Sequence, residues 1–136
     1  MSSFKIKKKL KTARKIKEEN DEGNIEYKWK ICDFQDLSRK EKLISQMRYR
    51  LNEGDGKAIY NIGYTDNGNP TGIVYTKLME SLMNFQDICN KAEATIKSIK
   101  IFRSKNKMQL TYCANIFIER STELDTFYMI TSDDLF

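Results

Sequence analysis

The sequence predicts an α+β domain: a mainly antiparallel sheet with two helices on one face, preceded by a basic N-terminal arm. Three observations support this fold class. Two segments place apolar residues at helical spacing, several segments alternate apolar and polar residues as strands do, and the first residues are strongly cationic. The expected order is strand, helix, strand, helix, strand, strand, and such an order is typical of helices packed on one side of a sheet.

The first strand is expected over residues 25–31, where apolar and polar residues alternate. Trp29 lies on the apolar side of this alternation, so we expect it to anchor the core rather than to form a stacking platform. The first helix is expected over residues 38–52, with Ser38 and Glu41 as a capping box. Off its apolar stripe lies a possible phosphate-contacting surface, for which a merely solvated face is the alternative: Arg39, Lys40, Arg48 and Arg50.

A glycine-rich loop and a tight turn border the central strand. Residues 53–56, Glu-Gly-Asp-Gly, end the first helix because glycine permits positive φ. Residues 58–64 alternate as a strand, and residues 66–70 are a run of turn formers. Thr76 is placed to cap a second helix that runs to about residue 91, with an apolar stripe that indicates core packing: Leu78, Leu82, Phe85, Cys89 and Ala92.

Two β-rich runs follow the second helix. In residues 95–103 the parity of the apolar positions shifts between Ile96 and Ile99, which predicts a β-bulge. Residues 104–107 form a polar, hairpin-like loop. Residues 127–130 could add a short last strand. The second run places its apolar residues on one face: Leu110, Tyr112, Ala114, Ile116 and Ile118.

Residues 46–72 carry a distinctive order of aromatic, glycine and charged residues. The residues that define it are Gln46, Met47, Arg50, Leu51, Glu53, Gly54, Gly56, Ala58, Tyr60, Ile62, Gly63, Asp66, Gly68 and Gly72. This order resembles the segment before the G domain in the eukaryotic elongation-factor-like GTP-binding proteins, which are relatives of the translational GTPases. Tyr49 stands where that pattern has tryptophan, and Lys57 where it has glutamate.

The resemblance covers roughly residues 23–131 and implies a translation-factor-like domain without the GTP-hydrolysing G domain. In that family a P-loop and a full G domain follow, whereas this sequence contains no G-x-x-x-x-G-K-[ST]. Asp55 and Glu53 would repel a triphosphate, so the loop at residues 54–56 is not a substitute. We therefore expect no GTPase activity and no bound nucleotide.

Composition limits the remaining classes. A chain of 136 residues predicts one domain. There is no histidine, and the three cysteines show no C-x-x-C, so no zinc site, cofactor or catalytic residue is predicted. We expect the cysteines to be buried thiols in a reducing compartment. The charged N-terminus and the lack of an apolar run of about 18 residues predict a cytoplasmic protein with no membrane partner.

Positive charge is concentrated at the start of the chain. Residues 1–17 hold seven lysines and Arg14 with no acidic residue, whereas the whole chain carries +5. The expected organisation is a basic RNA-binding arm (1–17), an acidic linker (18–24) and a single α+β domain (25–136). Such a block is typical of an extended arm that meets a polyanion and that could become helical when bound. A solubilising tail or a nuclear import signal is the alternative.

The predicted partner is the ribosome, through ribosomal RNA and neighbouring ribosomal proteins. A domain without GTP hydrolysis would stay bound, which suggests a non-catalytic factor that silences translation in hibernation or dormancy. The alternative is a free-standing interaction or regulatory module that binds a GTPase or another translation factor. The residues predicted to contact RNA are Lys5, Lys7, Lys8, Lys9, Lys11, Arg14, Lys15, Lys17, Arg48, Arg50, Lys105 and Lys107.

Overall fold

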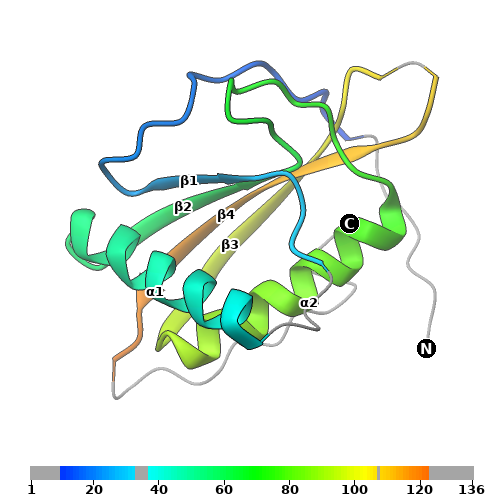
Figure 1. Cartoon of the computed structure of the whole chain (residues 1–136). Coiled ribbons are helices and arrows are strands. Elements are labelled where there is room, and N and C mark those ends of the chain that lie inside the picture. The colour runs from blue at the N-terminus through cyan, green and yellow to red at the C-terminus, as the bar shows by residue number, and fades with distance from the viewer. Residues whose placement is uncertain (1–9, 33–36, 107, 123–136) are drawn as a thin grey trace.

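The structure is a computed structural model that describes residues 10–32, 37–106 and 108–122. It confirms the α+β class and the expected order of elements over these residues (Figure 1). The predicted strand at residues 127–130 lies outside the described residues. The elements are β1 (Ile25–Lys28), α1 (Leu37–Glu53), β2 (Lys57–Ile62), α2 (Tyr75–Lys91), β3 (Ala94–Arg103) and β4 (Tyr112–Arg120).

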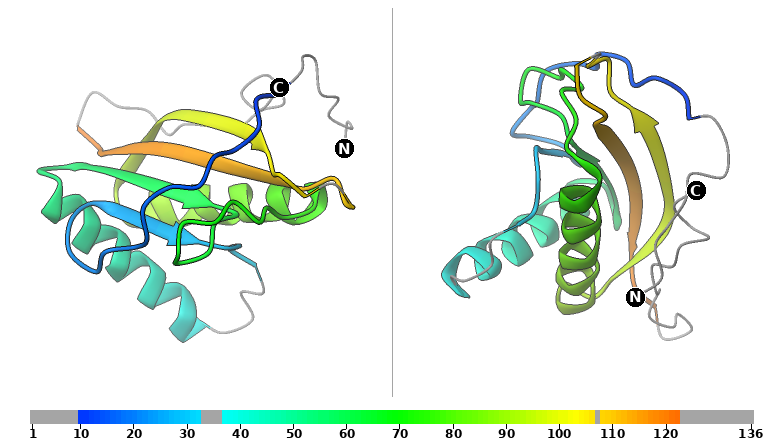
Figure 2. Two further views of the ribbon diagram at one scale, coloured as in Figure 1. Left: turned by 90° about the horizontal axis from the view of Figure 1, so that it is seen from above. Right: turned by 90° about the vertical axis from the view of Figure 1, so that its right-hand side faces the viewer.

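The strands form one four-stranded sheet in the order β1-β2-β4-β3. β2 pairs antiparallel with β4, and β4 pairs antiparallel with β3. β1 is parallel to β2 because the chain returns through α1 before it forms β2. Both helices cover the same face, and the opposite face, called here the open face, carries no helix of the described chain (Figure 2).

The core lies between this sheet and the two helices. α1 contributes Met47 and Leu51, while α2 contributes an almost fully buried stripe that includes Phe85. The ring of Phe85 meets Tyr60 of β2 edge to face, with 4.9 Å between centroids. The inward-facing side chains of β2 and β4 complete the core: Ala58, Tyr60, Ile62, Tyr112, Ala114, Ile116 and Ile118.

Three local predictions are confirmed. The register of β3 against β4 shifts between Ile96 and Ser98, which is the predicted β-bulge. α1 ends where expected, because Asp55 and Gly56 adopt φ of 52° and 91° and the N–H of Gly56 donates to the carbonyl of Leu51. All three cysteines are buried and free.

Other local predictions are wrong. Trp29 is 54% exposed rather than a core anchor, because β1 ends at Lys28 and the chain then leaves the sheet. Thr76 does not cap α2, which begins at Tyr75 with Val74 at the N-cap and no side-chain cap bond. Leu110 precedes β4 and is exposed. These positions are decided by where the chain bends, which alternation along a segment does not report.

Candidate nucleic-acid interface

The described part of the arm, residues 10–17, is packed onto the domain. Thr12 forms a parallel bridge with Arg103 at the end of β3. The N–H of Ala13 donates to the carbonyl of Arg103 at 2.6 Å, and the N–H of Arg103 donates to the carbonyl of Lys11 at 2.9 Å. Further along, the N–H of Ile16 donates to the carbonyl of Gly68. The predicted boundary at residue 25 is therefore wrong, since the folded domain already includes these residues.

Small and apolar side chains of the arm pack against the domain. Ala13 is 1% exposed and packs with Tyr64 and Cys113, and Ile16 and Phe102 close this second apolar cluster. No helix forms between residues 10 and 20, although the apolar spacing is nearly helical. The arm is extended because its backbone groups pair with the sheet end and the turn at residue 68. Figure 2 shows it crossing that end of the sheet.

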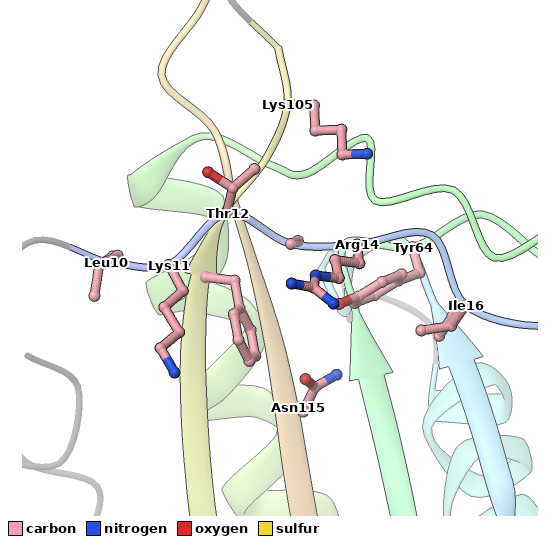
Figure 3. Close-up of a pocket in the computed structure, with 10 residues that line it drawn as sticks. Leu10, Lys11, Thr12, Arg14, Ile16, Tyr64, Lys105 and Asn115 are labelled. Carbon is pink, nitrogen blue, oxygen red and sulfur yellow. The ribbon is translucent and has the colours of Figure 1, made fainter.

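The described cations of the arm are exposed, whereas Ala13 is buried and Leu10 and Ile16 are half-buried. Lys11 and Arg14 line an open pocket of about 980 Å³ together with Lys105 from the β3–β4 loop. Figure 3 shows Lys11 and Arg14 reaching from the arm toward the open face, where Asn115 rises from β4. We call the exposed cations of this region the arm cluster: Lys11, Arg14, Lys15, Lys17 and Lys105.

The pocket floor carries groups that suit a nucleotide chain. Phe102 supplies a half-buried aromatic ring, whereas Tyr64 is 2% exposed and its ring is buried. Asn115 supplies an amide whose Nδ2 donates to Oδ1 of Asn61 at 2.5 Å. Lys15 and Lys17 line an adjoining hollow over the turn at residues 67–69. Cations beside aromatic rings are the combination with which proteins hold single-stranded nucleic acid.

Arg50 was predicted to contact RNA, and the structure corrects this. Its side chain is 3% exposed, and Nε donates to Oε1 of Glu26 at 3.1 Å. Its Nη1 donates to the carbonyls of Glu22 and Gly23. The helical stripe did not reveal this role, because the partner of Arg50 is a buried acid on β1 rather than an apolar side chain. A phosphate has no access to this guanidinium.

The predicted acidic linker is also part of the fold. Glu19 accepts a hydrogen bond from the N–H of Tyr27 at 2.7 Å and lies 4.0 Å from Arg50. Burial, followed by the hydrogen bond with Glu26, raises the pKa of Glu19 to about 7, although Tyr27 and Arg50 oppose this. Two carboxyl groups, one from the predicted linker and one from β1, therefore share Arg50 of α1.

The remaining predicted contacts do not join the arm cluster. Arg48 is exposed, but it lies in the helix layer and donates to the carbonyl of Lys91 at the end of α2. The other predicted contacts lie outside the described residues: Lys5, Lys7, Lys8, Lys9 and Lys107.

Sequence reasoning missed the outward side of β3 and β4. Phe102 and Phe117 are half-buried on the open face, and Lys100 is exposed between Ser98 and Phe102. The sequence signal for this face was the alternation along each strand. Phe102 and Phe117 do not share the alternation of the apolar residues that face the helices. An aromatic residue out of phase with a buried set points to the opposite face of its strand.

The glycine-rich loop does not form a phosphate cradle. Its N–H groups turn back onto α1: Gly54 donates to the carbonyl of Arg50 at 3.1 Å, and Asp55 donates to that of Asn52. P-loop binding requires such groups to point at the ligand. In the part of the chain that the structure describes, no three His, Cys, Asp or Glu residues are grouped to hold a metal ion. Within the same residues, no helix has the length and apolar character to cross a bilayer.

Sequence comparisons relate the chain to part of a GTP-binding protein. "GTP-binding protein 2" of Mus musculus and of Homo sapiens are each 38% identical over 82 residues, which is 60% of this chain and 14% of the relative. "Uncharacterized protein R625" of Acanthamoeba polyphaga mimivirus is 32% identical over 82 residues, 44% of its length. The chain thus spans only a small part of the GTP-binding relatives. No family model and no solved structure matches.

Proposed function

We propose that this protein is a non-catalytic, ribosome-binding protein whose arm cluster contacts ribosomal RNA and whose retention silences translation. The observation that carries the proposal is that different groups of the arm bind the domain and face the solvent. Its backbone and apolar side chains bind the domain, while five cations from two segments stay exposed around one pocket and the adjoining hollow. Within the described chain, none of the five forms a salt bridge with an acidic residue.

Electrostatics favours a phosphate partner. Exposed lysines and arginines gain little from isolated surface pairs, but they bind a polyphosphate by releasing its condensed counterions. The arm cluster is fixed on a folded surface, so less conformational entropy is lost on binding than for a free tail. The half-buried rings of Phe102 and Phe117 on the open face give bases an aromatic surface to contact.

The ribosome, rather than another polyanion, is suggested by the translation-factor-like resemblance of residues 46–72. The similarity to GTP-binding protein 2 supports a relation to a GTPase without supplying its partner. Because the sequence contains no P-loop, hydrolysis would not drive release of this chain. A bound protein that lacks this release step would block the site it occupies.

Two features favour a binding role over catalysis. The sequence has no histidine to act as a general base. Burial raises the pKa of all three cysteine thiols, to about 12 for Cys113, so they stay protonated and poorly nucleophilic at neutral pH.

A second candidate is a protein-interaction module, and the open face favours it. Ile25, Ile59 and Phe117 form a cross-strand row on that face, and Ser98 continues it on β3. Ile25 is 41% exposed, and Ile59 and Phe117 are only partly buried. A partly exposed apolar row suits contact with another protein, such as a GTPase or another translation factor.

Co-sedimentation separates the two candidates. Purified ribosomes are mixed with the wild type or with the variant Lys11→Glu/Arg14→Glu/Lys105→Glu, at about 50 mM and about 200 mM salt. The proposal expects the wild type in the ribosomal fraction at low salt, with loss at high salt or in the variant. A wild type that stays in the light fraction at low salt would contradict the proposal.

The control is Ile59→Asp, which disrupts the apolar row and leaves the arm cluster intact. If Ile59→Asp abolishes ribosome binding while the triple charge reversal does not, the interaction-module candidate is supported instead.

A further inference from the structure

Trp29 directly follows β1, and its side chain is both exposed and fixed by a hydrogen bond. It is the only tryptophan in the chain and is 54% exposed. Its Nε1–H donates to the carbonyl of Gly72 at 3.2 Å, so the polar edge of the indole is satisfied and its position is fixed. A fixed, exposed indole contributes little to the core, but it offers an aromatic surface to a ligand.

A basic pocket of about 280 Å³ adjoins Trp29. It is lined by residues at and just after the end of β1 and by residues of α1 between Arg39 and Gln46. Lys30 connects the two features, since it lines the pocket and its Nζ lies 5.4 Å from the centroid of the Trp29 ring. We call this cavity the Trp29 pocket. The cations that line it are Lys28, Lys30, Arg39 and Lys42.

Within the described residues, little negative charge lies beside this pocket. None of its lining residues is acidic, and the first turn of α1 contains no acidic residue. Among the described ion pairs, one involves a cation of this pocket, between Lys28 and Glu26 at 3.9 Å. The N-terminal end of α1 adds the positive end of a helix dipole. The remaining lining residues are Ile31, Leu43 and Gln46, none of which carries charge.

We propose that the Trp29 pocket is a second site for single-stranded RNA. A backbone phosphate would occupy the pocket, and the adjoining base would stack on Trp29 beside or in place of Lys30. The proposal rests on the proposed function for the class of partner but uses none of the same residues: the Trp29 pocket and the pocket of the arm cluster share no lining residue. The protein would then contact RNA at two separate positions.

Intrinsic fluorescence tests this directly because Trp29 is the only tryptophan. The full chain is titrated with a short oligouridylate at low salt. We expect saturable quenching by base stacking, and about tenfold weaker binding in Arg39→Glu/Lys42→Glu, where two phosphate-facing cations are reversed. Arg39→Ala/Lys42→Ala provides a milder second variant. Lys11→Glu/Arg14→Glu/Lys105→Glu should quench like the wild type.

Three results would overturn the inference. If the oligouridylate leaves the fluorescence unchanged while labelled RNA still binds through the arm cluster, the second site does not exist and the proposed function stands. If inorganic polyphosphate quenches equally, Trp29 does not stack on a base. If the arm variant abolishes the quenching, Trp29 responds to the arm cluster rather than to its own site. Quenching without any arm-dependent binding would instead support the Trp29 pocket and contradict the proposed function.

Discussion

In the arm, backbone groups and small apolar side chains make the contacts with the domain and the cations stay exposed; in helix α1, a buried arginine adds a polar contact with β1 to the apolar packing. Ala13 is buried and its neighbour Arg14 is exposed, whereas Arg50 of α1 is itself 3% exposed among Glu26 and two carbonyl groups. The same positive charge therefore serves opposite purposes in the two regions. Removing charge from the arm should cost binding, and removing it from Arg50 should cost stability.

The largest effect expected is on stability, in Arg50→Ala. The substitution leaves the buried carboxylate of Glu26 and the carbonyls of Glu22 and Gly23 without their donor. Breaking a buried pair in this way costs about 3–5 kcal/mol of unfolding free energy, measured by urea denaturation. The exposed Arg48→Ala is the control, with an expected cost of about 0.5–1 kcal/mol for one hydrogen bond. Equal costs would abolish the contrast between the regions.

The next effect is on RNA affinity, in Lys11→Glu/Arg14→Glu/Lys105→Glu. Reversing three exposed cations should weaken RNA binding by about 100-fold at low salt, or about 2.7 kcal/mol, and change the unfolding free energy by about 0.5 kcal/mol. Fluorescence anisotropy of labelled RNA and urea denaturation measure the two quantities. A large loss of stability with unchanged affinity would show that these cations hold the fold.

A smaller effect should separate anchoring of the arm from its charge. Gly68 has φ of +84°, and a Cβ there would lie 2.0 Å from the carbonyl oxygen of Ile16, so Gly68→Ala should displace the arm. Gly23→Ala is a matched control with φ of +89° and no atom within 4 Å of the added Cβ. We expect about 1 kcal/mol for the control, from backbone strain alone, and about 1–2 kcal/mol more for Gly68→Ala.

Limited trypsin digestion provides the readout for the arm itself. Cleavage after Lys15 or Lys17 should become faster in Gly68→Ala and remain slow in Gly23→Ala. Equal digestion of the two variants would mean that the turn at Gly68 does not anchor the arm.

A further effect, on the pH dependence of stability, concerns Glu19. Burial and the hydrogen bond with Glu26 raise the pKa of Glu19 from 4.5 to about 7, so between these values the folded state binds more protons than the unfolded chain. This group therefore makes stability fall as pH rises through that window, by at most about 1.4 kcal/mol per pH unit. Glu19→Gln removes the titration, so its stability relative to the wild type should increase from pH 4.5 to 7. A constant difference would contradict the assigned pKa.

The sequence predicted the elements that depend on local pattern. The helical stripes, the bulge after Ile96 and the glycine exit of α1 are visible because side-chain period and glycine conformation are local properties. The roles of Arg50 and Trp29 were predicted wrongly, since each depends on a partner distant in the chain: Glu26 for Arg50 and the carbonyl of Gly72 for Trp29.

The candidate site was predictable in composition but not in arrangement. The cationic block identified Lys11, Arg14, Lys15 and Lys17, because charge clustering needs no fold to be seen. Nothing in the pattern showed that Ala13 would be buried between two exposed residues, or that Lys105 would join the same pocket. Those facts follow from backbone pairing between the arm and β3.

The salt dependence of RNA affinity tests the central idea most directly. The logarithm of the binding constant is measured against the logarithm of salt concentration for the wild type and for Lys11→Glu/Arg14→Glu/Lys105→Glu. If these three cations each neutralise a phosphate of single-stranded RNA, the slope should become less steep by about 2 in the variant. Equal slopes in the two proteins would show that the exposed cations of the arm cluster do not contact phosphate, and the account would be wrong.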